Sequence, residues 1–168
     1  MTFFVPFDGS ELSRTALVRA VEFADVFEER VVAASVVPAG NREYARERGW
    51  LHHDESFELS RVVARLHEQV ASIAPAADFE HVTVGRFAPS GTIAGELRDL
   101  AREEDASIVF IGSENAGGLS STLGSVGASV AAEDAYDVHI VQNGAPSKVS
   151  MLTDESPDTR EKSDFYLP

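Results

Sequence analysis

The chain has 168 residues, 43% of them hydrophobic, which is enough for one core of ordinary size and too few for two full domains. It has no cysteine, which excludes disulfides, thiolate metal sites and thiol nucleophiles. With 28 acids against 14 bases, the formal net charge is −14, which disfavours contact with nucleic acids and anionic membranes. We therefore expect a partner of another class.

The same composition predicts where the protein works. The first ten residues, MTFFVPFDGS, lack a basic region and reach an acid at Asp8, so we expect no secretory signal. No apolar run approaches the roughly 20 residues of a membrane-spanning helix. We expect a cytoplasmic protein. The only lysines are Lys148 and Lys162, and this acidic, lysine-poor composition favours adaptation to high salt, with an ordinary acidic protein as the alternative.

Apolar residues alternate along the chain between short continuous runs and helical spacing, which predicts alternating strands and helices. The strands are expected at residues 2–7, 31–37, 80–87, 107–111 and 137–142. The third of these alternates in polarity, as a strand near a sheet edge does. The helices are expected at residues 11–28, with Ser10 as N-cap, at 56 to about 75, from 90 onward, and at 125–133.

This order predicts an α/β fold: an open, mostly parallel five-stranded sheet of Rossmann-like type with helices on both faces. Residues 1–143 are expected to form this domain, and residues 144–168 a polar, acidic C-terminal tail. The segment NREYARERGWLHHDE, from Asn41 to Glu55, is polar and aperiodic, so it is either a surface loop or a poorly packed helical turn.

Residues 111–125, IGSENAGGLSSTLGS, follow the fourth strand and precede a helix. Glycines let the backbone approach a ligand, and helix N-termini present free N–H groups, so this stretch suits a phosphate group. The donors would be the amides near Gly112 and those of Gly124, Ser125 and Val126. The stretch contains neither a GK[ST] nor a GxGxxG motif. From the residues alone, a turn without a ligand remains the alternative.

Three parts of the chain are informative together: FFVPFDGSELSRTAL at the front, IVFIGS, GGLS and LGSV in the middle, and DVHIVQ at the last strand. In these stretches the chain resembles the universal stress protein family, and the resemblance covers nearly all of residues 2–143. Nucleotide-binding members carry the motif G-x2-G-x9-G-[ST], and here Gly112, Gly124 and Ser125 match it. Asn115 stands at the second glycine, and eight residues rather than nine separate it from Gly124.

The resemblance also implies a pocket for an adenine nucleotide. Asp8 matches the aspartate near the nucleoside, and Val36 the position that packs against adenine. Ile111 precedes the phosphate loop, and Phe7, after Pro6, either stacks near the base or fills part of the cavity. The residues themselves leave simpler roles open: Asp8 as an Asx turn or cap, and Val36 and Phe7 as core. The implied ligand is ATP, or AMP, with Mg²⁺ accompanying the nucleotide.

The resemblance leads to two candidate functions. The first is an adenine-nucleotide binding module of the stress response, and the resemblance implies a homodimer through the fifth strand, Asp137 to Gln142. The alternative is a dimer without nucleotide that acts by protein–protein interaction, which Asn115 and the shorter spacing favour. An enzyme on a flavodoxin-like fold is a third possibility. No catalytic triad, acid pair or metal site is expected, although slow ATP hydrolysis stays open.

Overall fold

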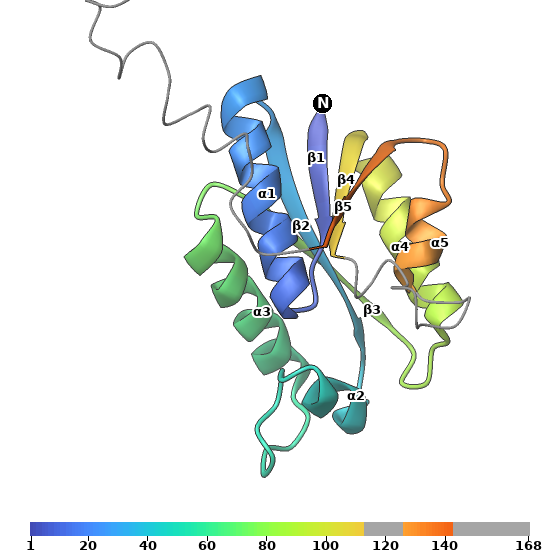
Figure 1. The fold of residues 1–168 in the computed structure, drawn as a ribbon. Helices are drawn as coiled ribbons and strands as arrows, with labels where there is room; N and C mark the ends of the chain where they lie inside the picture. The colour runs from blue at the N-terminus through green and yellow to red at the C-terminus, as the bar shows by residue number, and fades with distance from the viewer. Residues whose placement is uncertain (113–125, 143–168) are drawn as a thin grey trace, which may run out of the picture.

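The computed structural model describes residues 1–112 and 126–142, which form an α/β fold (Figure 1). The elements in chain order are β1 (Thr2–Pro6), α1 (Glu11–Phe27), β2 (Arg30–Pro38), α2 (Arg42–Glu47), α3 (Leu59–Ile73), β3 (Asp78–Val84), α4 (Ser90–Glu103), β4 (Ala106–Gly112), α5 (Val126–Ala131) and β5 (Asp137–Val141). The expected tail, residues 144–168, lies outside the described residues.

The five strands form one sheet in the order β3-β2-β1-β4-β5, and every neighbouring pair is parallel. The predicted fold class is therefore confirmed. β1 lies at the centre, and all five of its residues are buried. β3 is an edge strand with alternating burial, as its sequence predicts, and β5 is the opposite edge. The order reverses between β1 and β4, which places a ligand site at their carboxyl ends.

Helices cover both faces of the sheet: α1 and α3 one face, α4 and α5 the other (Figure 1). Because successive residues of a strand point to opposite faces, β1 sends Phe3 and Val5 toward α1 and Phe4 toward α4. All three are at most 3% exposed. Burying a side chain of this size contributes about 1.5–3 kcal/mol, so the two apolar layers hold the sheet in place.

The end of β1 and the start of α1 are fixed by local hydrogen bonds. Ser10 has extended backbone, and its hydroxyl accepts a hydrogen bond from the Ser13 amide at 3.3 Å, so it caps α1 as the sequence predicts. α1 ends at Phe27, one residue earlier than expected, because Glu28 adopts left-handed backbone with a φ of 57°.

The third strand differs most from the prediction: it spans Asp78–Val84 rather than residues 80–87. Its register with β2 runs from Val32↔Asp78 to Pro38↔Val84, so it ends where β2 ends. Residues 85–88 turn away instead, with the Ala88 amide donating to the Gly85 carbonyl. Likewise α3 begins at Leu59 rather than at residue 56, and α5 covers 126–131 rather than 125–133.

In residues 1–112 and 126–142, no helix combines the length and apolar character needed to cross a membrane.

Candidate functional site

A cleft opens at the carboxyl ends of the central strands. The empty space in and above this cleft is about 460 Å³, which includes the part open to solvent. The lining residues are mostly apolar and come from β1, β2, β4, α2, α4 and α5: Pro6, Phe7, Asp8, Ala34, Val36, Tyr44, Arg48, Trp50, Ile93, Leu97, Ile111 and Val126.

Six of the residues expected from the sequence meet in this cleft: Pro6, Phe7, Asp8, Val36, Ile111 and Val126. Asn115, Gly124 and Ser125 lie outside the described residues. Gly112 ends β4 and is not among the described residues that line the cleft, and its expected contact with phosphate remains a prediction.

Gly112 lies against the first turn of α1. A Cβ placed there would come within 2.8 Å of the Leu12 carbonyl carbon. No other side chain fits without moving the α1 backbone, so glycine is required here by packing, whatever the neighbouring loop binds. Gly112 therefore fixes how closely α1 approaches the end of β4.

The end of β1 is held to β2 by two hydrogen bonds. The Phe7 amide donates to the Ala34 carbonyl at 2.8 Å, and the Ser35 hydroxyl donates to the Phe7 carbonyl at 2.6 Å. Phe7 is only 3% exposed and belongs to the core on the α1 face, so it forms part of the cleft wall as well as of the core.

Asp8 forms an Asx turn, which is the simpler of the two roles that the sequence left open for it. Its Oδ1 accepts a hydrogen bond from the Ser10 amide at 2.9 Å, which makes an Asx turn ahead of α1. The half-buried side chain also lines the cleft. Asp8 is the one carboxylate among the described lining residues.

The sequence analysis missed the wall that α2 contributes, which consists of Tyr44, Arg48 and Trp50. α2 begins at an N-cap, Asn41, whose Oδ1 accepts a hydrogen bond from the Tyr44 amide at 3.0 Å. Its far end is a Schellman motif. There the Trp50 amide donates to the Ala45 carbonyl at 2.8 Å and the Gly49 amide to the Arg46 carbonyl at 3.0 Å.

Gly49 makes this ending possible, since its φ of +71° is left-handed backbone that other residues rarely adopt. The motif brings Trp50 back beneath α2, where it is 2% exposed and contacts the Tyr44 ring edge-on at 5.6 Å between centroids. An arginine followed by glycine and tryptophan was the available signal: glycine just past a helix, then an apolar residue that packs back onto it.

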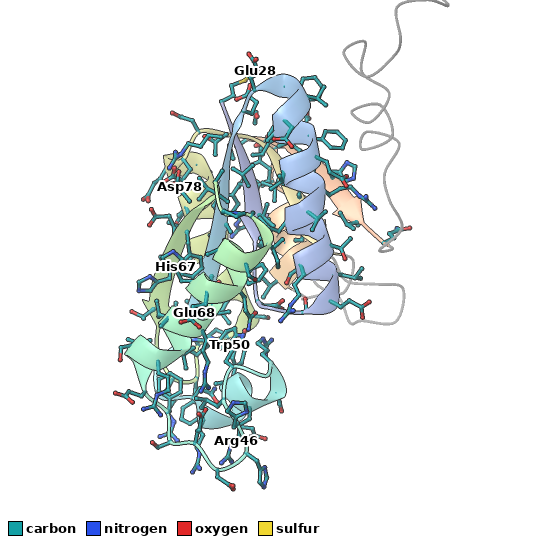
Figure 2. All side chains as sticks on the ribbon, turned by 90° about the vertical axis from the view of Figure 1, so that its left-hand side faces the viewer. Glu28, Arg46, Trp50, His67, Glu68 and Asp78 are labelled. Carbon is teal, nitrogen blue, oxygen red and sulfur yellow. The ribbon has the colours of Figure 1, made fainter. Side chains whose placement is uncertain are left out.

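Trp50 also ties the α2 wall to β1 and α3. Its indole Nε1 donates a hydrogen bond to the Asp8 carbonyl at 2.7 Å. Its own carbonyl accepts from the Arg65 guanidinium at 2.8 Å, and Arg65 also pairs with Glu55 at 2.5 Å. Figure 2 shows Trp50 toward the end of the molecule that carries α2, away from Glu28.

Charges are few in the cleft. The guanidinium carbon of Arg48 lies 3.4 Å from the centroid of the Tyr44 ring, a cation–π contact. Burial, opposed by Arg48 and reinforced by Asp8, raises the pKa of the Tyr44 hydroxyl above its usual value, so Tyr44 is a neutral hydrogen-bonding group at neutral pH. Among its described lining residues, the cleft thus offers one carboxylate, one hydroxyl and one guanidinium in an apolar surround.

The segment from His52 to Glu55, with its histidines and acids, is the other candidate site in the sequence. In the structure the His52 backbone amide and the Arg65 guanidinium donate to the Glu55 carboxylate, and the Arg46 guanidinium donates to the His53 backbone carbonyl. Among the residues that the structure describes, no three histidine, aspartate or glutamate side chains converge as metal ligands.

Comparison with solved structures gives the same fold. A universal stress protein in complex with cAMP superposes with a TM-score of 0.55 at 23% identity, covering 84% of this chain and 97% of that one. The universal stress protein UspA from Lactobacillus plantarum gives 0.56 at 17% identity, over 84% and 97%. The Archaeoglobus fulgidus universal stress protein in complex with dAMP gives 0.50 at 18%, over 84% and 96%. At these identities the likeness shows the fold alone.

An open parallel α/β sheet with a cleft at its switch point defines a Rossmann-like fold. The sequence model of the Universal stress protein family matches residues 1–142, nearly the whole of the described chain. The chain belongs to the Universal stress protein family. No curated protein matches it.

Proposed function

We propose that the protein is an adenine-nucleotide binding module of the stress response. The observation that carries this proposal is the convergence of Asp8, Val36 and Ile111, from three separate strands, on one apolar cleft at the switch point. Small-molecule sites of this kind are apolar with a few placed polar groups, which is what the cleft offers. The relatives with cAMP and dAMP support an adenine nucleotide as the ligand.

The cleft fits a nucleoside better than it fits a metal ion. An apolar wall suits a base, and the Asp8 carboxylate and Tyr44 hydroxyl suit ribose hydroxyls. One carboxylate is a weak Mg²⁺ site by itself, so Mg²⁺ would arrive with the phosphates of ATP. The phosphate contacts expected at Gly124 and Ser125 remain predictions from sequence, as does the cytoplasmic location.

The second candidate function is that of a dimer with the same fold that binds no nucleotide and acts by protein–protein interaction. β5 is an edge strand whose Ile140 is 44% exposed, and an unpaired edge with an apolar side chain suits pairing with a second copy. Asn115 and the shortened spacing also favour this alternative. The proposed homodimer through Asp137 to Gln142 is compatible with both functions.

Thermal unfolding with and without Mg²⁺-ATP, in dilute buffer and in molar KCl, tests the proposal. A ligand at 100 times its dissociation constant adds about 2.7 kcal/mol, a shift of several degrees for a domain of this size. We expect a saturable shift with ATP and a smaller one with adenosine. No shift in either salt, from folded protein free of copurified nucleotide, would refute nucleotide binding and leave the dimer as the function.

A further inference from the structure

We propose that Arg48 is a specificity-determining contact for the base of the bound nucleotide, with Tyr44 as the platform that positions its guanidinium. This inference rests on the nucleotide-binding function proposed above. It gives the α2 wall a role: to select a purine ring by stacking and hydrogen bonding.

The first step is that Arg48 is held in place at the cleft. Tyr44 and Arg48 are four residues apart, so they share one side of the helical turn, where the Arg48 amide donates to the Tyr44 carbonyl at 3.3 Å. The guanidinium carbon then lies 3.4 Å from the Tyr44 ring centroid, and Arg48 is half-buried and lines the cleft. The N-cap at Asn41 and the Schellman ending at Gly49 fix both ends of this turn.

The second step is that the positive charge of Arg48 is not paired with a carboxylate among the described residues. Arg48 forms no ion pair within residues 1–112 and 126–142, whereas five other arginines do: Arg19, Arg30, Arg61, Arg65 and Arg102. It is also the one basic side chain among the described lining residues. In a chain of net charge −14, where carboxylates outnumber bases, a cleft guanidinium paired only with a tyrosine ring is free to bind a ligand.

The third step explains why Arg48 would contact the base of the nucleotide and not its phosphates. Arg48 follows β2, and β1 separates β2 from β4, whose carboxyl end leads into the predicted phosphate loop. Arg48 therefore lies on the Val36 side of the cleft, where the base is expected. A guanidinium plane stacks on nucleobases, and its N–H groups donate to ring nitrogens without accepting in return. A purine offers the larger stacking face and the acceptors N3 and N7.

The experiment compares Arg48→Lys with the matched control Arg86→Lys in titrations with adenosine, AMP, ATP and the pyrimidine nucleotide UMP. Arg86 lies over the Phe87 ring at 5.1 Å, a contact of the same kind outside the cleft. Lysine keeps the charge and loses the planar fork. We expect Arg48→Lys to weaken the three adenine ligands by the same factor, about tenfold, with an unchanged salt dependence, so that the preference of the protein for AMP over UMP falls, and Arg86→Lys to leave this preference unchanged.

Three results would overturn the inference. Equal binding by wild type and Arg48→Lys would refute the contact while leaving nucleotide binding intact. A loss that grows from adenosine to AMP to ATP would move Arg48 to the phosphates. Wild type that binds none of the ligands would refute the proposed function together with the inference. Urea midpoints verify that each variant is folded.

Discussion

The indole Nε1 of Trp50 and the backbone carbonyl of Asp8 are joined by a hydrogen bond of 2.7 Å, although the two residues are 42 positions apart. This bond links the α2 wall to the end of β1, the two parts of the cleft that carry its polar groups. Trp50 is also the only tryptophan of the chain, so it is a built-in fluorescent reporter of the cleft.

Trp50→Phe is expected to lower the free energy of unfolding by about 1–3 kcal/mol, because the Asp8 carbonyl loses its donor. Nucleotide affinity should fall as well, since Asp8 is no longer held. Urea unfolding followed by circular dichroism and calorimetric titration with AMP measure the two effects. Tyr136→Phe is the control: it removes a buried 2.8 Å bond from the Tyr136 hydroxyl to the Val130 carbonyl, outside the cleft lining. It should lose stability and keep its affinity, and a matching loss of affinity in both variants would contradict this role of Trp50.

Gly112→Ala is expected to destabilise the protein by about 1–3 kcal/mol, because the new methyl group meets the backbone of Leu12 rather than a side chain that can rotate away. Gly95→Ala, in α4, is the matched control, since nothing lies within 4 Å of its added Cβ. That change should stabilise α4 by about 0.5–1 kcal/mol. Equal midpoints of urea unfolding for the two variants would show that the packing argument fails.

The ion pair of Glu55 with Arg65 should make stability depend on pH in the acid range. The Arg65 guanidinium, helped by the His52 amide, lowers the pKa of Glu55 from 4.5 to about 2. Between these values the unfolded chain binds the proton more readily, so the stabilisation is complete above pH 4.5 and is lost as the pH falls toward 2. We expect the stability difference between wild type and Glu55→Gln, measured by urea midpoints, to shrink as pH falls from 6 to 3. A constant difference would exclude the pair as its cause.

Molar KCl is expected to raise the midpoint of thermal unfolding. The formal charge of −14 makes the folded chain repel itself, and at about 1 M salt the screening length falls to roughly 3 Å. The rise should be gradual between 0.1 and 1 M and should appear equally in circular dichroism and fluorescence. A midpoint that falls with KCl would refute the expectation of adaptation to high salt.

Ile140→Glu should weaken the proposed homodimer by tenfold or more, because it places a charge on the exposed face of the β5 edge. Phe87→Glu is the control, since Phe87 is 81% exposed but follows β3 at the other side of the sheet. Sedimentation equilibrium distinguishes the two. If wild type is monomeric, or if both variants dissociate alike, the β5 interface is wrong.

The fold was predictable because its signals are local. Continuous apolar runs around Phe4 and Val109 mark strands buried on both faces, and Ser10 marks the start of α1. The end of β3 was not predictable in this way. β3 ends at Val84 because its partner strand β2 ends opposite it, at Pro38. This end is a property of the paired strands and not of the sequence at 84–87.

The cleft was predictable only in part. Asp8, Val36 and Ile111 come from strand ends that meet at one edge of the sheet, and the structure brings all three to the cleft, while their contacts with a nucleotide remain predictions. Tyr44 and Trp50 were missed because they come from a six-residue helix, too short to show periodicity, and from the turn that follows it. Their position depends on the Schellman turn at Gly49 and on a hydrogen bond to a distant carbonyl, neither of which hydrophobic spacing reveals.

Titration of wild-type Trp50 fluorescence with AMP, in molar KCl, is the most direct test of nucleotide binding in the cleft. The account predicts a saturable change in intensity or wavelength, because the indole lines the cleft beside Asp8 and Tyr44. The same change should appear with ATP. A signal that stays flat up to millimolar AMP and ATP, from folded protein free of copurified nucleotide, would contradict nucleotide binding in this cleft.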